Sequence, residues 1–205
     1  LRTVTGVQTC ALPISEIMAL EGATPKAALK QVQEAIDTWV WYAGWTDKIS
    51  STAGSTNPIA GPYYNFTIPE PLGVVGIFAE QKSSLLGVIR GLAPVLASGN
   101  SAVVVASERR PLPAITLSEC CATSDVPSGV INILTGVTSE LAPWRASHME
   151  VDGIDISGLD PKSDADIRKS GTENLKRINR FKSENSPDRI LSFMEYKTVW
   201  HPIGI

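Results

Sequence analysis

Hydrophobic residues in the middle of the chain form short runs that are separated by segments of helical length. Three such runs are Val74–Ala79, Ala102–Val105 and Val130–Leu134. They recur at intervals of ~30 residues, the size of a β-strand, helix, β-strand unit. Strands that are apolar on both faces and alternate with helices predict a parallel sheet covered on both sides. Gly153–Ile156 is the fourth run, so the sequence predicts an α/β fold with a four-stranded core.

Helical periodicity flanks this core. Thr24 and Pro25 are typical of an N-cap and a first helical residue. The helix that they begin ends in an aromatic cluster, which is either a ligand-stacking site or packing against the sheet; we favour packing. The cluster consists of Trp39, Trp41, Tyr42 and Trp45. Farther along the chain, a short helix is expected over 139–148.

The pattern changes after the fourth run. From residue 159 to 189 charges are dense and large apolar side chains are sparse. We expect an amphipathic helix over 164–178, with Ile167, Leu175 and Ile178 on its apolar face, and then a linker over 181–188. Apolar character returns at 190–200, which predicts a closing strand.

Composition narrows the class of protein. The 205 residues are 43% hydrophobic and 19% charged, with a net charge of −3. Without a basic patch, nucleic acid is not an expected partner. No apolar run approaches the ~20 residues of a membrane span. Three cysteines give no disulfide framework, which favours a reducing cytoplasm. His148 and His201 have no ligand-like neighbours, so no metal site is predicted.

Four phrases of the sequence carry a resemblance to a known family. They are Glu70–Gly76, Leu92–Asn100, Ser107–Leu112 and Gly129–Gly136. In order and spacing they resemble the cofactor domain of the aldehyde dehydrogenase superfamily. The resemblance covers about residues 16–158 and returns at Tyr196–Val199. It implies a Rossmann-like, mostly parallel sheet with flanking helices, a small β oligomerisation arm, and NAD(P)-dependent oxidation of aldehydes.

The resemblance also implies a set of cofactor-binding positions, but several differ from the family. The family's Lys-Pro-Ser-Glu is here Val105 to Glu108, so the lysine that binds the ribose is lost. Its Phe-Thr-Gly-Ser is here Ile156 to Leu159, and the following Asp160 places a negative charge near the expected pyrophosphate. We therefore expect no tightly bound cofactor, although NAD(P) is the family's cofactor. The candidate positions are Phe78, Ala79, Ser107, Glu108 and Gly158.

Catalytic residues have no counterpart in this sequence. The family's nucleophilic cysteine and general-base glutamate lie beyond the fourth strand, in a part that we do not find here. Cys120 and Cys121 fall on a helix, where a cysteine is an ordinary small hydrophobe. Lys82 stands where the family has its oxyanion asparagine. We expect a non-catalytic structural or regulatory subunit; the alternative is an active NAD(P)-dependent oxidoreductase, alone or by completing a partner's site.

The resemblance suggests how the chain is divided. Residues 1–14 resemble translated sequencing-adapter sequence and are expected to be an artefact or disordered. Residues 15–158 form the cofactor-type domain with an arm strand at 63–68. A charged helix and linker follow at 159–189, and 190–205 is the C-terminal arm strand. A full-length aldehyde dehydrogenase, or a second copy of this chain, is the expected partner, bound through the aromatic side chains of Tyr63, Tyr64, Phe66 and Trp200.

Overall fold

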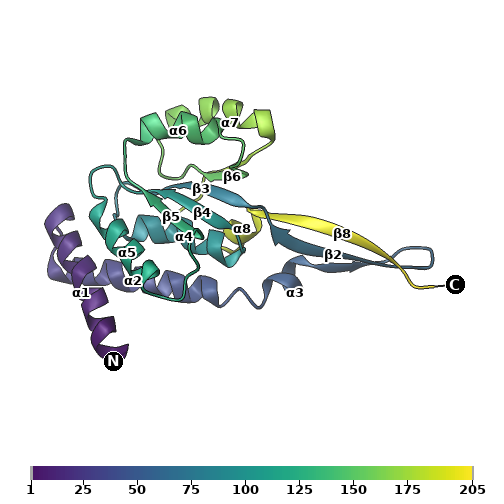
Figure 1. Cartoon of the computed structure of the whole chain (residues 1–205), viewed down its shortest axis with the longest axis horizontal. Coiled ribbons are helices and arrows are strands. Elements are labelled where there is room, and N and C mark those ends of the chain that lie inside the picture. The colour runs from purple at the N-terminus through teal and green to yellow at the C-terminus, as the bar shows by residue number, and fades with distance from the viewer. Residues whose placement is uncertain (1, 205) are drawn as a thin grey trace.

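The structure, a computed structural model, describes residues 2–204 and the side chains of residues 12–204. It contains two sheets, a body sheet of five strands and an arm sheet of three. Figure 1 shows that the arm projects from the body and carries the C-terminus near its far end. No helix within 2–204 is long and apolar enough to cross a membrane.

The body sheet is parallel throughout, with the strand order β5-β4-β3-β6-β7. Its central strands are buried on both faces, as the continuous apolar runs predict. The expected α/β class and the parallel, helix-flanked sheet are confirmed. The strands are β3 (Val74–Phe78), β4 (Ser101–Val105), β5 (Ile131–Leu134), β6 (Gly153–Asp155) and β7 (Arg177–Asn179).

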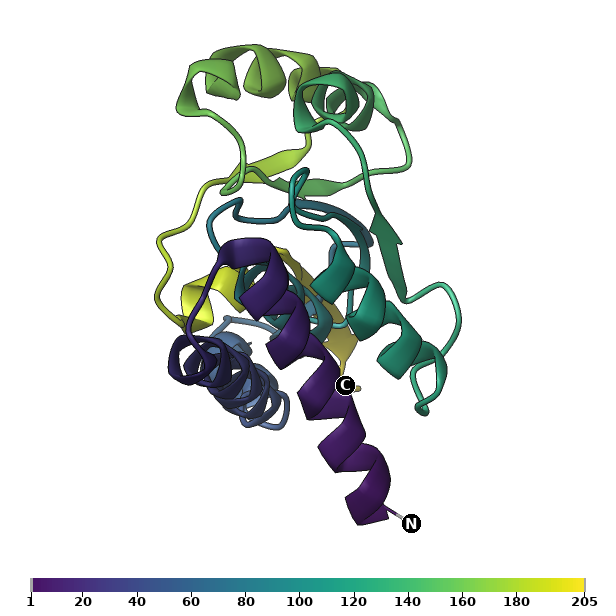
Figure 2. The same cartoon turned by 90° about the vertical axis from the view of Figure 1, so that its left-hand side faces the viewer.

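Helices cover both faces of this sheet (Figure 2). On one face lie α1 (Arg2–Glu21), α2 (Pro25–Ala43), α4 (Leu86–Ala97), α5 (Leu112–Ala122) and the short α8 (Pro187–Leu191). On the other lie α6 (Thr138–Ser147) and α7 (Asp164–Gly171), which is bracketed by the 3-10 turns Pro161–Ser163 and Thr172–Asn174. Tyr42 is buried and its three tryptophan neighbours pack beside it, so the aromatic cluster belongs to the core.

A fifth strand replaces the end of the expected 164–178 helix. Helix α7 ends at Gly171, where a Cβ would lie 2.5 Å from Cδ1 of Ile178. Leu175 has a left-handed backbone (φ 58°) that turns the chain, and its side chain is 88% exposed. Ile178 is buried, but in β7 beside β6 rather than on a helix. The predictions of a helix over 172–178 and of a four-stranded core were therefore wrong, whereas Ile167 is buried on α7 as expected.

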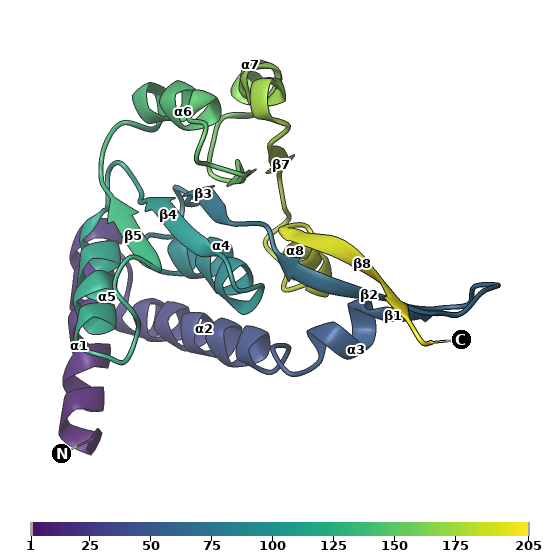
Figure 3. The same cartoon turned by 45° about the vertical axis from the view of Figure 1, so that its right-hand side comes forward.

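The arm sheet has β2 (Tyr63–Pro71) between β1 (Ser55–Asn57) and β8 (Met194–Pro202). Strands β2 and β8 pair antiparallel from Tyr63–Pro202 to Pro71–Met194. The expected pairing of the two arm segments is thus present, over longer strands than predicted. The helix α3 (Ile49–Ala53) leads into the arm (Figure 3).

A buried amide fixes the root of the arm to the body. Asn100, just before β4, is 3% exposed. Its Oδ1 accepts from the backbone N–H of Gly73 (2.7 Å), and its Nδ2 donates to the carbonyl of Phe193 (2.8 Å). One side chain therefore joins the start of β3 to the residue before β8. Both ends of the arm are held at the same point of the body sheet.

A buried ion pair joins α8 to the middle of the body sheet. The side chains of Asp155, on β6, and Arg189, on α8, are 2% and 4% exposed and approach to 3.3 Å. The other carboxylate oxygen of Asp155 accepts hydrogen bonds from the backbone and hydroxyl of Ser157. The guanidinium of Arg189 also lies 4.8 Å from the ring centre of Phe181 and donates to the carbonyl of Lys182. Burial raises the pKa of Asp155, while Arg189 and Ser157 oppose that rise.

The N-terminal helix is continuous through the residue where the fold was expected to begin. Helix α1 runs from Arg2 past Ser15, and its last turns belong to the body. Glu16 accepts a hydrogen bond from Thr116 on α5 (2.6 Å), and Glu21 accepts two from Ser84. The side chains of residues 1–11 lie outside the described ones. The interpretation of the first fourteen residues as an artefact or disordered stays a prediction.

The Asp155–Arg189 pair predicts an asymmetric response to substitution. Arg189→Met leaves a buried carboxylate without a counter-charge, which should cost about 3–5 kcal/mol of unfolding free energy at neutral pH. Adding Asp155→Asn should recover most of this loss, because the uncompensated charge is then gone. Urea unfolding of wild type and of these two variants measures both effects. An exposed pair supplies the control: Lys30→Met, which breaks the 3.6 Å contact with Glu34, should change stability by no more than about 0.5 kcal/mol.

The deficit of Arg189→Met should also depend on pH. With the guanidinium gone, only the hydrogen bonds from Ser157 still oppose the effect of burial, so the pKa of Asp155 rises further above its usual value. The penalty for the buried charge is absent while the carboxyl is protonated and grows as pH rises through that raised pKa. The variant should therefore be closer to wild type at pH 5 than at pH 7.5. An equal deficit at both pH values, or a double variant no better than Arg189→Met, would contradict this account.

Candidate functional site

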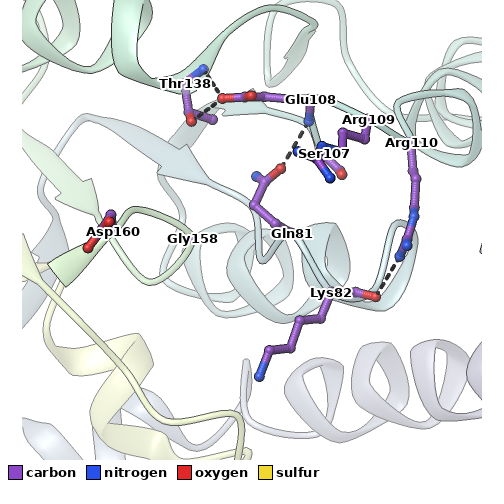
Figure 4. A pocket seen from close by; sticks show the side chains of 9 residues that line it. All are labelled: Gln81, Lys82, Ser107, Glu108, Arg109, Arg110, Thr138, Gly158 and Asp160. Atoms are coloured by element: carbon purple, nitrogen blue, oxygen red, sulfur yellow. Dashed lines mark hydrogen bonds between the residues drawn. The ribbon is translucent and has the colours of Figure 1, made fainter.

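A pocket of about 540 Å³ lies at the carboxyl ends of the body strands. In an open parallel sheet, ligands usually bind outside the carboxyl ends of the strands, at the point where the strand order reverses. Loops after β3, β4 and β6 and the first residue of α6 line it (Figure 4). The lining residues are Gln81, Lys82, Ser107, Glu108, Arg109, Arg110, Thr138, Gly158 and Asp160.

Three of the five predicted cofactor positions reach this pocket. Ser107, Glu108 and Gly158 line it. Phe78 and Ala79 are 1% exposed and lie at the end of β3. The positions of these residues do not test whether they bind a cofactor, so the binding role of all five stays a prediction. The sequence patterns did not single out Gln81, Arg109, Arg110 or Thr138 as pocket residues. Their positions, directly after predicted strands or at the start of a helix, could have indicated that they line the pocket.

Glu108 is already occupied by contacts within the chain. Its Oε1 accepts hydrogen bonds from the backbone N–H (2.5 Å) and the hydroxyl of Thr138, at the start of α6. These two bonds lower the pKa of Glu108, so the carboxylate is charged at neutral pH. A negative group at a helix N-terminus is also favoured by the helix dipole. Glu108 thus fixes the β4 loop to α6, and a ribose hydroxyl would have to share this carboxylate with Thr138.

Gly158 has a structural reason to be glycine that involves no ligand. A Cβ at this position would lie 2.1 Å from the carbonyl oxygen of Ala79 and 2.4 Å from that of Phe78. The Gly158 N–H donates to the Phe78 carbonyl at 3.0 Å. The loop after β6 is therefore packed directly onto the end of β3. This close approach requires a glycine whether or not a phosphate binds beside it.

The positions where the family has a lysine and a serine are filled by apolar side chains. Val105 is fully buried and Leu159 is 7% exposed. Both belong to the cluster under α6 and α7 that also contains Phe78. Asp160 then uses its Oδ1 to accept from the backbone N–H of Lys162 (3.0 Å), which caps the turn before α7. A carboxylate therefore occupies the backbone donor nearest to where a pyrophosphate is expected.

The loop after β3 forms its own network. Gln81 donates to the Ala79 carbonyl (2.9 Å) and accepts from the backbone N–H of Glu108 (3.0 Å). Arg110 donates to the Lys82 carbonyl at 3.2 Å. The Lys82 ammonium points away from Glu108 in Figure 4. Ser107 is different: its hydroxyl is buried and has no hydrogen-bond partner within the described side chains, so it is the polar group most ready for a ligand.

Neither cysteine of α5 lies in this pocket. Cys120 lines a separate apolar cavity with Trp39 and Leu117. Burial, and then the neighbouring Cys120, raise the pKa of the Cys121 thiol, which lowers its thiolate fraction. No group of three potential metal ligands occurs within the described part of the chain. The arrangement therefore offers hydrogen bonds and cations to an anionic ligand, and no activated nucleophile.

Comparison with known proteins identifies the family. The profile of the "Aldehyde dehydrogenase family" matches residues 4–183. Human retinal dehydrogenase 2 is 33% identical over 181 residues, which are 87% of this chain and 34% of that protein. A putative aldehyde dehydrogenase from Burkholderia cenocepacia superposes with a TM-score of 0.75 at 26% identity, over 84% of this chain and 36% of that one.

A structure described as an NAD+ complex of aldehyde dehydrogenase from Bacillus cereus superposes with a TM-score of 0.71 at 25% identity, over 83% of this chain and 36% of that one. The chain spans about a third of the length of the relatives that it matches. The family profile, which matches most of the chain, and the 33% identity to human retinal dehydrogenase 2 show that this chain belongs to the aldehyde dehydrogenase family.

Proposed function

We propose that this chain is a non-catalytic member of the aldehyde dehydrogenase family that acts as a structural or regulatory subunit. One observation carries the proposal. From β7 the chain passes through residues 180–193 directly to the arm strand β8, and this connection is packed onto the body sheet. The connection contains neither a cysteine nor a pocket-lining glutamate. The nucleophile and base that aldehyde oxidation needs in this family have no place in it.

The Asp155–Arg189 pair supports the view that the connection is an integral part of the fold. Asp155 lies on a central strand of the body sheet, and its counter-charge comes from α8, within the connection. A buried aspartate without Arg189 would be strongly unfavourable. The two segments therefore depend on each other for stability.

The open arm supports a role in association. Strand β8 is the last strand of its sheet, so one of its edges has no neighbour within the described chain. One aromatic pair crosses the ribbon from β2 to β8, with 6.0 Å between the ring centres of Tyr63 and Trp200. A second pair lies along β2, with 5.2 Å between the ring centres of Tyr64 and Phe66. Trp200 is 60% exposed. A full-length aldehyde dehydrogenase is the proposed partner, with self-association as the second possibility.

The first prediction concerns activity. The purified chain should not reduce NAD or NADP with any aldehyde, because no cysteine among residues 12–204 lines its pocket and the two carboxylates there, Glu108 and Asp160, already accept hydrogen bonds within the chain. Spectroscopic measurement of NADH or NADPH formation, with a full-length family enzyme in the same buffer as positive control, checks this. Turnover above the no-protein control that disappears in Cys120→Ser or Cys121→Ser would contradict it.

The second prediction concerns the cofactor. The dissociation constant for NAD and NADP should be weaker than about 1 mM, which corresponds to ~4 kcal/mol. Asp160→Asn keeps the capping oxygen but removes the charge, and should improve affinity roughly five- to tenfold, since about 1 kcal/mol remains after solvent screening. Calorimetry measures both. Asp125→Asn, an equal charge change on an exposed loop after α5, is the control and should have no effect. A micromolar constant for wild type would contradict the prediction.

The third prediction concerns the arm. Tyr63→Ser with Trp200→Ser should weaken association with a full-length aldehyde dehydrogenase, or self-association, because exposed aromatic side chains that an interface would bury are lost. Light scattering after co-expression measures the assembly. Trp144→Ser removes an even more exposed tryptophan from the body and should leave assembly unchanged. A wild type that is strictly monomeric and ignores the full-length enzyme would show that the arm does not serve association.

A further inference from the structure

A second cavity lies farther along helix α6 than the candidate cofactor pocket, which touches only the first residue of that helix. It encloses about 400 Å³ between α6 and strands β3, β4 and β5 of the body sheet. Figure 3 shows α6 above β4 and β5, on the half of that face that α7 does not cover. Its walls are mainly apolar and include Leu134, Leu141 and Trp144. Seven residues separate Arg145 in this cavity from Thr138 in the cofactor pocket, about 10 Å along the helix.

Arg145 is the unusual residue of this cavity. It is 9% exposed, and its Nη1 donates to the carbonyl of Val103 at 3.2 Å. No Asp or Glu among residues 12–204, whose side chains are described, forms an ion pair with it. Burial lowers the pKa of Arg145, although a guanidinium remains charged at neutral pH. The cavity therefore contains a buried positive charge that no carboxylate of the described chain neutralises, an unfavourable state unless an anion comes from outside.

The sheet makes room for this arginine. Gly76, in the middle of β3, lies under its stem, and a Cβ there would be 2.8 Å from Cδ of Arg145. The guanidinium is thus held by its packed stem and by the Val103 carbonyl, with further N–H donors left for a ligand. The other titratable groups at the cavity are His148 and Glu150, where the Glu150 N–H donates to Nδ1 of His148 at 3.2 Å. Neither forms an ion pair with Arg145.

The apolar walls indicate the rest of the ligand. Trp144 is 77% exposed and Leu134 is 41% exposed, so large apolar side chains next to the buried charge face solvent. A cavity of this size, mostly apolar with one fixed polar group, is typical of a small-molecule site. We propose that it binds a small carboxylate with an apolar chain, with the carboxylate on Arg145 and the hydrocarbon against Leu134, Leu141 and Trp144. This site is separate from the cofactor pocket and does not depend on the proposed function.

Decanoate is the probe, titrated into the full chain by calorimetry, with decanol as its uncharged counterpart. Wild type should bind decanoate with a sub-millimolar constant and at least about tenfold more tightly than decanol, as expected for hydrogen bonds to a charged group. Arg145→Met keeps the stem over Gly76 and should abolish this preference while decanol affinity stays within about twofold. Arg109→Met, the same change at an exposed arginine of the cofactor pocket, should leave decanoate binding unchanged.

Several results would overturn the proposal: no binding of decanoate up to 1 mM, equal affinity for decanol, or a loss of binding in Arg109→Met rather than in Arg145→Met. If Arg145→Met does not fold, nuclear Overhauser contacts in wild type decide the question. Contacts from decanoate to the methyl groups of Leu134 and Leu141 support the site, and contacts confined to other residues exclude it. Competition by NAD should be absent, and mutual exclusion would place decanoate in the cofactor pocket.

Discussion

The buried pair of Asp155 and Arg189 is the constraint on which the body and the arm jointly depend. Asp155 stands on β6, which pairs with β3 and β7 within the body sheet, and its buried carboxylate meets α8 through Arg189. A carboxylate there is costly unless it is paired and hydrogen-bonded. Its partner lies 34 residues later in the sequence, and the intervening segment must therefore fold back across the sheet edge. The pair thus joins the path of the connecting segment to the body sheet.

That path determines where the arm begins. Phe193, four residues after Arg189, is fully buried against the body sheet, and its carbonyl receives Asn100. Strand β8 starts at the next residue and immediately pairs with β2. Because Asn100 also holds Gly73, the strand entering the body and the strand leaving it are tied together at one point. The arm can project as a long two-stranded ribbon, a marginal structure alone, because its root is anchored in the core.

The sequence predicts the parts of this fold that have a strong periodic signal. The runs at 74–79, 102–105 and 130–134 predict three adjacent parallel strands, and the structure has them in that arrangement. Strand β7 could not be found in this way. It has three residues, is flanked by Lys176 and Arg180, and has one buried apolar side chain, Ile178, whose spacing from Ile167 also fits a helix. Helix α7 ends at Gly171, which lies against Ile178 of β7, and the left-handed backbone of Leu175 then turns the chain. The contact between Gly171 and Ile178 cannot be read from the sequence pattern.

The candidate site was predictable in location but not in its internal bonding. The family resemblance singles out Ser107, Glu108 and Gly158, and because each follows a strand of a parallel sheet, they are expected at one edge of the sheet. No sequence pattern states that Glu108 is bonded to Thr138, 30 residues away, or that a Cβ at Gly158 would meet two carbonyl oxygens of β3. The Asp155–Arg189 pair was missed for the same reason: each residue stands in a segment with other charges, and only the three-dimensional path shows which charges are buried.

The hydrogen bonds within the pocket bear on whether a pocket in this position of the family's fold binds a dinucleotide. Glu108 is bonded to Thr138, Asp160 to the backbone of Lys162, and Gln81 bridges Ala79 and Glu108. We infer that a dinucleotide would have to exchange these bonds for its own, which would leave little net gain in free energy. The contacts that close the pocket also join the loops after β3 and β4 to α6. Groups at the carboxyl edge that face a ligand in an enzyme of this family can therefore serve here to hold the loops and the body sheet together.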